Sequence, residues 1–135
     1  MNHHPHLRAY LAGVAFPTLV LPLFLVLFIL GRLVYDIGIP IERVAVFPLA
    51  LLPILWGAWN ALYFRAGVGR AMPLGLHGAI LFAVFAPFGY MMSHFVLNLT
   101  LPFSLFLKLY PVGLIVYYFL WKYLVAFFNR ALGLA

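Results

Sequence analysis

The sequence contains no cysteine, and only two of its 135 residues, Asp36 and Glu42, are acidic. Without cysteine there is no disulfide, no thiolate zinc site, no cysteine-ligated iron–sulfur cluster and no cysteine nucleophile. The HExxH, GxSxG and GxxxxGK[ST] patterns are absent as well. General acid–base or nucleophilic catalysis therefore has no candidate residue with a positioned partner, and we do not expect an enzyme.

Charge of either sign is scarce. Charged residues make up 7% of the chain, against about 25% in an ordinary soluble domain. Hydrophobic residues make up 67%, and the mean hydropathy is +1.14. Such a chain cannot cover its surface with polar groups, so lipid is its expected solvent. The formal charge of +6 comes from scattered lysines and arginines, which favours anionic lipid headgroups as partners and not nucleic acid.

Long apolar runs define the expected architecture. A bilayer with a hydrocarbon core of about 30 Å needs roughly 20 apolar residues per helical crossing. The sequence predicts four transmembrane helices over residues 9–30, 44–64, 74–97 and 109–128. We therefore expect one all-α domain, residues 1–135, folded as an up-down four-helix bundle. Prolines inside these runs predict kinks near Pro17, Pro22, Pro53 and Pro87.

Small and aromatic residues have distinct places in these runs. Gly75, Ala79 and Ala83 recur every four residues, which puts them on one helical face and lets another helix backbone approach closely. Trp56 and Trp59 lie toward the far end of the second predicted span, as aromatic rings do at a membrane interface. The pattern indicates a protein with several packing faces and an interfacial aromatic belt.

The main candidate site joins Asn60 and His77. Asn60 lies near the end of the second predicted span and His77 near the start of the third, so a short connection places them at similar depth. We predict one pocket at the inner leaflet, bordered by Lys122, Arg65 and Arg70. Amide, imidazole and cationic groups suit a phosphate, a quinone carbonyl or a lipid headgroup. The alternative is that each side chain bonds water or headgroups independently.

No cofactor is predicted, although histidines leave haem and copper as weaker alternatives. About 26 Å of helix separates His94 from His77, so the two cannot bind the same haem. A haem at either histidine would need a second ligand from another subunit. At the N-terminus, a free amine and His3 form a possible Cu(II) site, to which His4 and His6 add ligands. The alternative, which needs no metal, is that these three histidines belong to a polar tail.

The sequence leaves function hypotheses of different classes open. Abundant packing faces and little intramembrane polarity favour an accessory or interaction subunit of a membrane assembly, as a homo- or hetero-oligomer. The alternative is a binding or transport module for a lipid-like or quinone-like molecule at the inner leaflet. A third hypothesis is an enzyme acting on a lipid headgroup. Membrane lipids, including anionic headgroups, are the expected partners in each case.

The distribution of basic residues predicts the orientation in the cell membrane. Four crossings put both termini on one side with Arg8, Arg65, Arg70, Lys122 and Arg130, and leave Arg32, Arg43 and Lys108 on the other. By the positive-inside rule, we expect both termini in the cytoplasm. Reporter fusions at residue 135 and near Gly38 should report the cytoplasmic and the external side, respectively. An external signal from residue 135 would reject this orientation.

Overall fold

The computed structural model describes residues 3–36, 38, 43, 49–66, 71–99 and 101–134, and in these residues it contains helices and no strand. The elements are α1 (Pro5–Tyr35), η1 (Leu49–Leu51), α3 (Leu52–Arg65), α4 (Leu74–Phe95), α5 (Phe103–Phe119), η3 (Leu120–Val125) and α6 (Ala126–Ala131). The element η1 is a 3₁₀ turn and η3 is a π-helix. The predicted all-α class is confirmed for the described part of the chain.

Three stretches of helix are long and apolar enough to cross a membrane. They are α1, α4, and the continuous helix Phe103–Ala131 formed by α5, η3 and α6. These helices suggest a membrane-embedded protein. The last one begins at Phe103, earlier than the predicted span, so Pro111 lies inside a helix and not in its first turn. The 14 residues of α3 fall short of the roughly 20 that a crossing needs.

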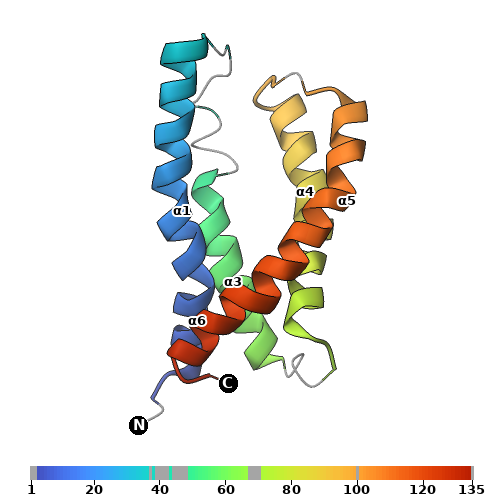
Figure 1. Ribbon diagram of the computed structural model, residues 1–135. Coiled ribbons are helices and arrows are strands. Elements are labelled where there is room, and N and C mark those ends of the chain that lie inside the picture. The colour runs from blue at the N-terminus through green and yellow to red at the C-terminus, as the bar shows by residue number, and fades with distance from the viewer. Residues whose placement is uncertain are drawn as a thin grey trace.

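The helices form two pairs that meet at one end of the molecule (Figure 1). Helix α1 packs along α3, and α4 packs along α5, with successive long helices running in opposite directions. The two pairs lie together at the end that holds both termini and diverge toward the other end. At the shared end, Gly133 lies directly against the guanidinium of Arg8, which brings the two ends of the described chain together.

The interior prolines occupy two kinds of position. Pro17 and Pro22 lie inside α1, and Pro87 lies inside α4, where the kinks predicted from the sequence stay predictions. Pro53 instead lies in the first turn of α3, directly after the 3₁₀ turn. A proline is accommodated there because the N–H it lacks would have no intrahelical acceptor. Pro53 therefore begins a described helix and does not interrupt one.

The core lies where the helices meet. Trp56 of α3, Leu81 of α4, and Trp121 and Val125 of η3 are buried against one another. The rings of Trp56 and Trp121 have centroids 5.3 Å apart, and Phe16 and Tyr117 pack around them. The expectation that Trp56 belongs to an interfacial belt is therefore wrong. The physical reason is that glycines on neighbouring helices leave room for large rings inside the bundle.

Two glycines mark close approaches between helices, and the second of them leaves room for an indole. A Cβ atom added to Gly13 of α1 would stand 2.9 Å from the Cα of Gly57, so the backbones of α1 and α3 touch. A Cβ atom on Gly78 of α4 would overlap the indole of Trp121. Of the predicted small-residue stripe, Gly75 does face a neighbouring helix, because a Cβ atom added to it would stand 3.0 Å from Tyr118. The tightest contact of α4 nevertheless falls at Gly78, outside that stripe.

Replacing Gly78 by alanine should destabilise the bundle. The methyl group has no space beside Trp121, and overpacking of this kind costs about 1–3 kcal/mol. Gly89→Ala is the matched control because it lies in the same helix, gains the same helix propensity and faces open space. Unfolding measured in mixed micelles should show a lower free energy of unfolding for G78A and an unchanged or higher one for G89A. Equal stability of both variants would contradict a close contact between α4 and η3.

Candidate functional site

A reciprocal amide pair ties three helices together at the end that holds the termini. Asn60 of α3 donates from Nδ2 to Oδ1 of Asn129 in α6 at 2.7 Å, and Asn129 donates back to Asn60 Oδ1 at 3.2 Å. Asn60 also donates to the backbone oxygen of Ala9 in α1 at 2.7 Å. Both asparagines are buried, with exposed fractions of 0% and 1%. We call Asn60, Asn129 and Ala9 the amide clasp.

The amide clasp satisfies its own hydrogen-bonding needs. A primary amide has two donor hydrogens and one acceptor oxygen, and Asn60 uses both the nitrogen and the oxygen within the chain. An amide without partners in an apolar medium would carry a penalty of several kcal/mol. A polar ligand arriving here would have to replace contacts that are already made. The geometry is that of a structural lock between helices.

A second reciprocal contact joins α3 to α4. Trp59 donates from Nε1 to the backbone oxygen of His77 at 2.8 Å, and His77 Nε2 lies 2.9 Å from the backbone oxygen of Trp59. A carbonyl oxygen only accepts, so His77 carries its proton on Nε2. The two rings are stacked with centroids 4.8 Å apart at 20°. Each residue therefore holds the other by its side chain and its backbone.

The indole of Trp121 is the exception to this pattern of satisfied groups. In the part of the chain that the structure describes, its buried Nε1 has no hydrogen-bond partner. Its neighbours are aromatic: Trp56, whose own Nε1 donates to the Tyr117 hydroxyl at 3.4 Å, and the edge-on ring of His77, with centroids 5.8 Å apart. Trp121 Nε1 is thus a donor left over in an otherwise paired core.

The predicted pocket residues lie at the same end of the fold but have different partners. Asn60 and His77 are both buried, at 0% and 3% exposure, so neither faces lipid. The hydrogen bonds of Asn60 go to Ala9 and Asn129, whereas those of His77 go to Trp59. A pocket shared by Asn60 and His77 stays a prediction.

The predicted basic border is spread over the outside. Lys122 is exposed, and its Nζ lies 5.4 Å and 5.7 Å from the ring centroids of Tyr123 and Tyr118. Arg65 is exposed in the last turn of α3. Arg70 lies outside the described residues. Lys122 and Arg65 therefore lie on the exposed surface, whereas the asparagines of the amide clasp are buried.

The histidines considered for metal binding are exposed, and they lie at two different ends of the molecule. His3, His4 and His6 lie at the start of α1, and the rings of His3 and His4 have centroids 6.5 Å apart. His94 lies in the last turn of α4, stacked on Tyr90 at the other end of the molecule. No three histidine, aspartate or glutamate side chains gather within the described ranges. Met1 and Asn2, which the copper hypothesis requires, lie outside them.

The fourth predicted span ends at residue 128, although α6 continues to Ala131 and buries Asn129. A signal for this existed, because Trp121, Val125 and Asn129 recur every four residues and all three are buried.

Comparison with protein-family models, curated proteins and solved structures finds no match for this chain. The function must therefore be argued from the clasp and the surface around it.

A double-mutant cycle should reveal coupling between Asn60 and Asn129. Asn60→Leu or Asn129→Leu alone leaves a buried amide without its partner, at a cost of about 1–3 kcal/mol. The double variant removes both amides, so its loss in free energy of unfolding should be smaller than the sum of the losses of the two single variants. Interhelical hydrogen bonds in membranes average about 0.6 kcal/mol and reach about 1.7, which sets the expected coupling. Additive losses in micellar unfolding would contradict the clasp.

Proposed function

We propose that this protein is a small multi-pass membrane protein that acts as an accessory or interaction subunit of a membrane assembly. The observation that supports this most is the amide clasp, in which the buried polar groups are used to join helices. A module that binds a polar ligand needs donors or acceptors that are free in the resting protein. Here the asparagines and His77 already have intramolecular partners.

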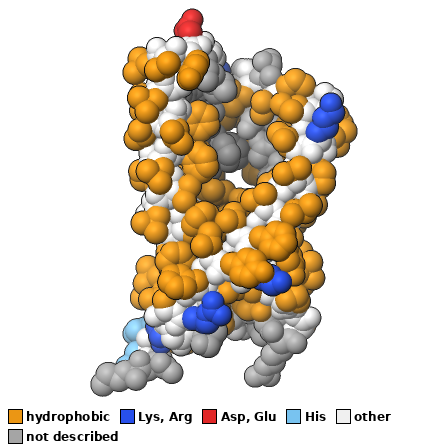
Figure 2. Space-filling view, in the orientation of Figure 1, with side chains coloured by type: hydrophobic (Ala, Val, Ile, Leu, Met, Phe, Trp, Pro, Cys, Tyr) orange, Lys and Arg blue, Asp and Glu red, His pale blue; other side chains and the backbone are white. Residues whose placement is uncertain are grey.

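The outer surface supports the same proposal. Apolar side chains cover the visible face from end to end (Figure 2). On α1, large residues of the second half stand well exposed, including Leu23, Leu27 and Leu33 at 63–77%. This surface must be covered by lipid or by helices of other subunits, since water would not solvate it. A subunit that assembles through such faces needs no reactive site.

The proposal includes the number of membrane crossings and the side on which the termini lie. We infer four crossings, with α3 and the residues before it forming the second one, and both termini at the cytoplasmic side of the cell membrane. The alternating helix directions and the shared end of the termini support this arrangement (Figure 1). So do Arg8, Arg65, Lys122 and Arg130, all on the elements that meet at that end.

The unpaired Trp121 N–H favours a second candidate, the binding module for a quinone-like or lipid-like molecule. A carbonyl oxygen of such a molecule would supply the acceptor that the described residues do not. This candidate requires room beside His77 and Trp56, whose rings already pack around the indole. No comparable observation favours the third hypothesis, an enzyme acting on lipid headgroups.

Native mass spectrometry of the protein released from native-membrane nanodiscs should separate the two candidates. For a subunit, we expect masses of an oligomer or of a stoichiometric protein complex, unchanged in Trp121→Phe. For a binding module, a small-molecule adduct should be present and should be lost in Trp121→Phe. Tyr35→Phe, which alters an exposed aromatic residue at the other end, is the control. A monomer carrying such an adduct would contradict the accessory role.

A further inference from the structure

Lys122 occupies an unusual depth along the C-terminal helix. About 33 Å of helix separates Lys108 from Arg130 at 1.5 Å per residue, which matches a hydrocarbon core of about 30 Å. The exposed side chains of Lys108 and Arg130 therefore fit the two edges of this span. Lys122 lies about 12 Å of helix before Arg130, which puts its backbone inside the apolar stretch.

In the described part of the chain, the ammonium group of Lys122 has aromatic rings as neighbours and no carboxylate partner. The only acidic residues of the sequence are Asp36, which ends α1 at the far end of the molecule, and Glu42, which lies outside the described residues. Nζ of Lys122 instead lies 5.4 Å from the ring centroid of Tyr123 and 5.7 Å from that of Tyr118. Attraction to exposed rings is weaker than the cost of placing an ammonium group in hydrocarbon. An anion from outside the described residues would supply the counter-charge that they do not.

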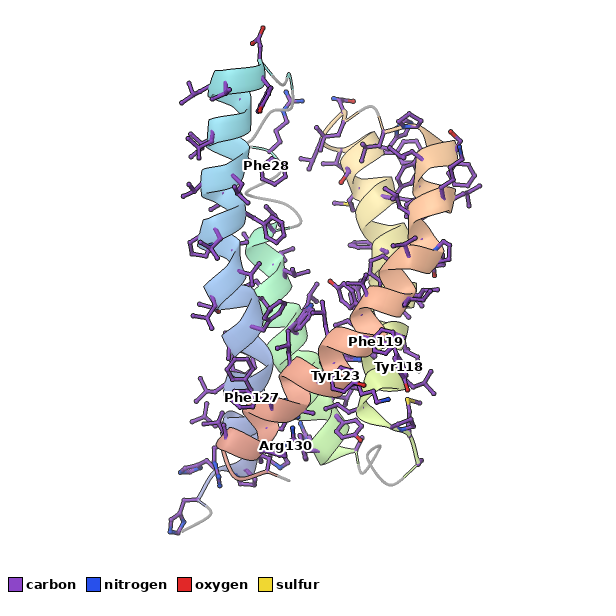
Figure 3. The ribbon with its side chains drawn as sticks, viewed as in Figure 1. Phe28, Tyr118, Phe119, Tyr123, Phe127 and Arg130 are labelled. Carbon is purple, nitrogen blue, oxygen red and sulfur yellow. The ribbon has the colours of Figure 1, made fainter. Side chains whose placement is uncertain are left out.

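The surface around Lys122 is exposed and aromatic. Phe119, Tyr123 and Phe127 recur every four residues and are 48–58% exposed. Figure 3 shows them on one side of the C-terminal helix, with Arg130 at its lower end. From a position inside the apolar stretch, lysine reaches the headgroup level by extending its long side chain.

We propose that Lys122 binds the phosphate of an anionic phospholipid in the leaflet at the termini, with Tyr118 and Tyr123 flanking the ammonium group. This rests on the proposed membrane-spanning role. A lipid phosphate is favoured over an acidic helix of another protein because the end where the described basic residues Arg8, Arg65 and Arg130 gather would attract a mobile anion. The long side chain of a lysine at this depth also has the reach to bring its charge to the headgroups.

The test uses the full chain in nanodiscs of phosphatidylcholine alone and of phosphatidylcholine mixed with phosphatidylglycerol. Native mass spectrometry counts the lipids retained by the wild-type protein and by Lys122→Gln, Lys122→Arg and Lys108→Gln. Lys108→Gln is the matched control, because it removes the same charge from an exposed lysine at the other end of the same helix. We expect preferential phosphatidylglycerol retention in the wild type, K122R and K108Q, and a several-fold reduction in K122Q.

Three results would overturn the proposal. One is equal retention in K122Q and the wild type, and another is an equal reduction in K108Q, which would show dependence on net charge alone. The third is a carbodiimide crosslink in native membranes that joins Lys122 to a carboxylate of another protein and is absent in K122Q. Unchanged circular dichroism and elution of K122Q, with recovery in K122R, exclude misfolding. Failure of every variant to insert would overturn the membrane-spanning role as well, whereas insertion without lipid preference overturns the lipid site alone.

Discussion

The reciprocal pair of Asn60 and Asn129 is the interaction on which the arrangement of the helices depends. Apolar side chains in lipid lose little by facing tails instead of one another, so hydrophobicity alone does not choose which helix faces meet. A buried amide does choose, because it needs a donor and an acceptor at defined positions. By bonding Asn129 and the backbone of Ala9, Asn60 selects one rotation for each of α1, α3 and α6.

The other contacts at this end of the molecule also fix which helix faces meet. Trp59 and His77 connect α3 to α4 through two hydrogen bonds, and the close approaches at Gly13 and Gly78 let the rings of Trp56 and Trp121 fill the space between helices. Polar and aromatic anchoring is therefore concentrated where the termini lie. Toward the other end the helix pairs separate (Figure 1), which leaves one half of α1 largely exposed.

Sequence reasoning was strongest where a property belongs to a single helix. The apolar runs located α1 and α4 closely, and the scarcity of charge indicated lipid as the solvent. It was weaker at ends: the last helix begins at Phe103 and continues past Asn129, because Pro111 and Asn129 are tolerated inside a helix once neighbours pack against it. It also singled out Asn60 and His77 as polar positions, whereas the hydrogen-bond partners of each are given only by the tertiary structure.

The sequence by itself determined the all-helical class of the described residues and the long apolar helices that suggest a membrane-embedded protein, since hydropathy and helix length are sums over consecutive residues. Only the tertiary structure decided that Asn60 pairs with Asn129, that Trp56 and Trp121 face inward, and that Gly78 is a point of closest approach. Such pairings depend on how helices distant in sequence are rotated and crossed. A few degrees of rotation exchange one neighbour for another without changing the hydropathy of either helix.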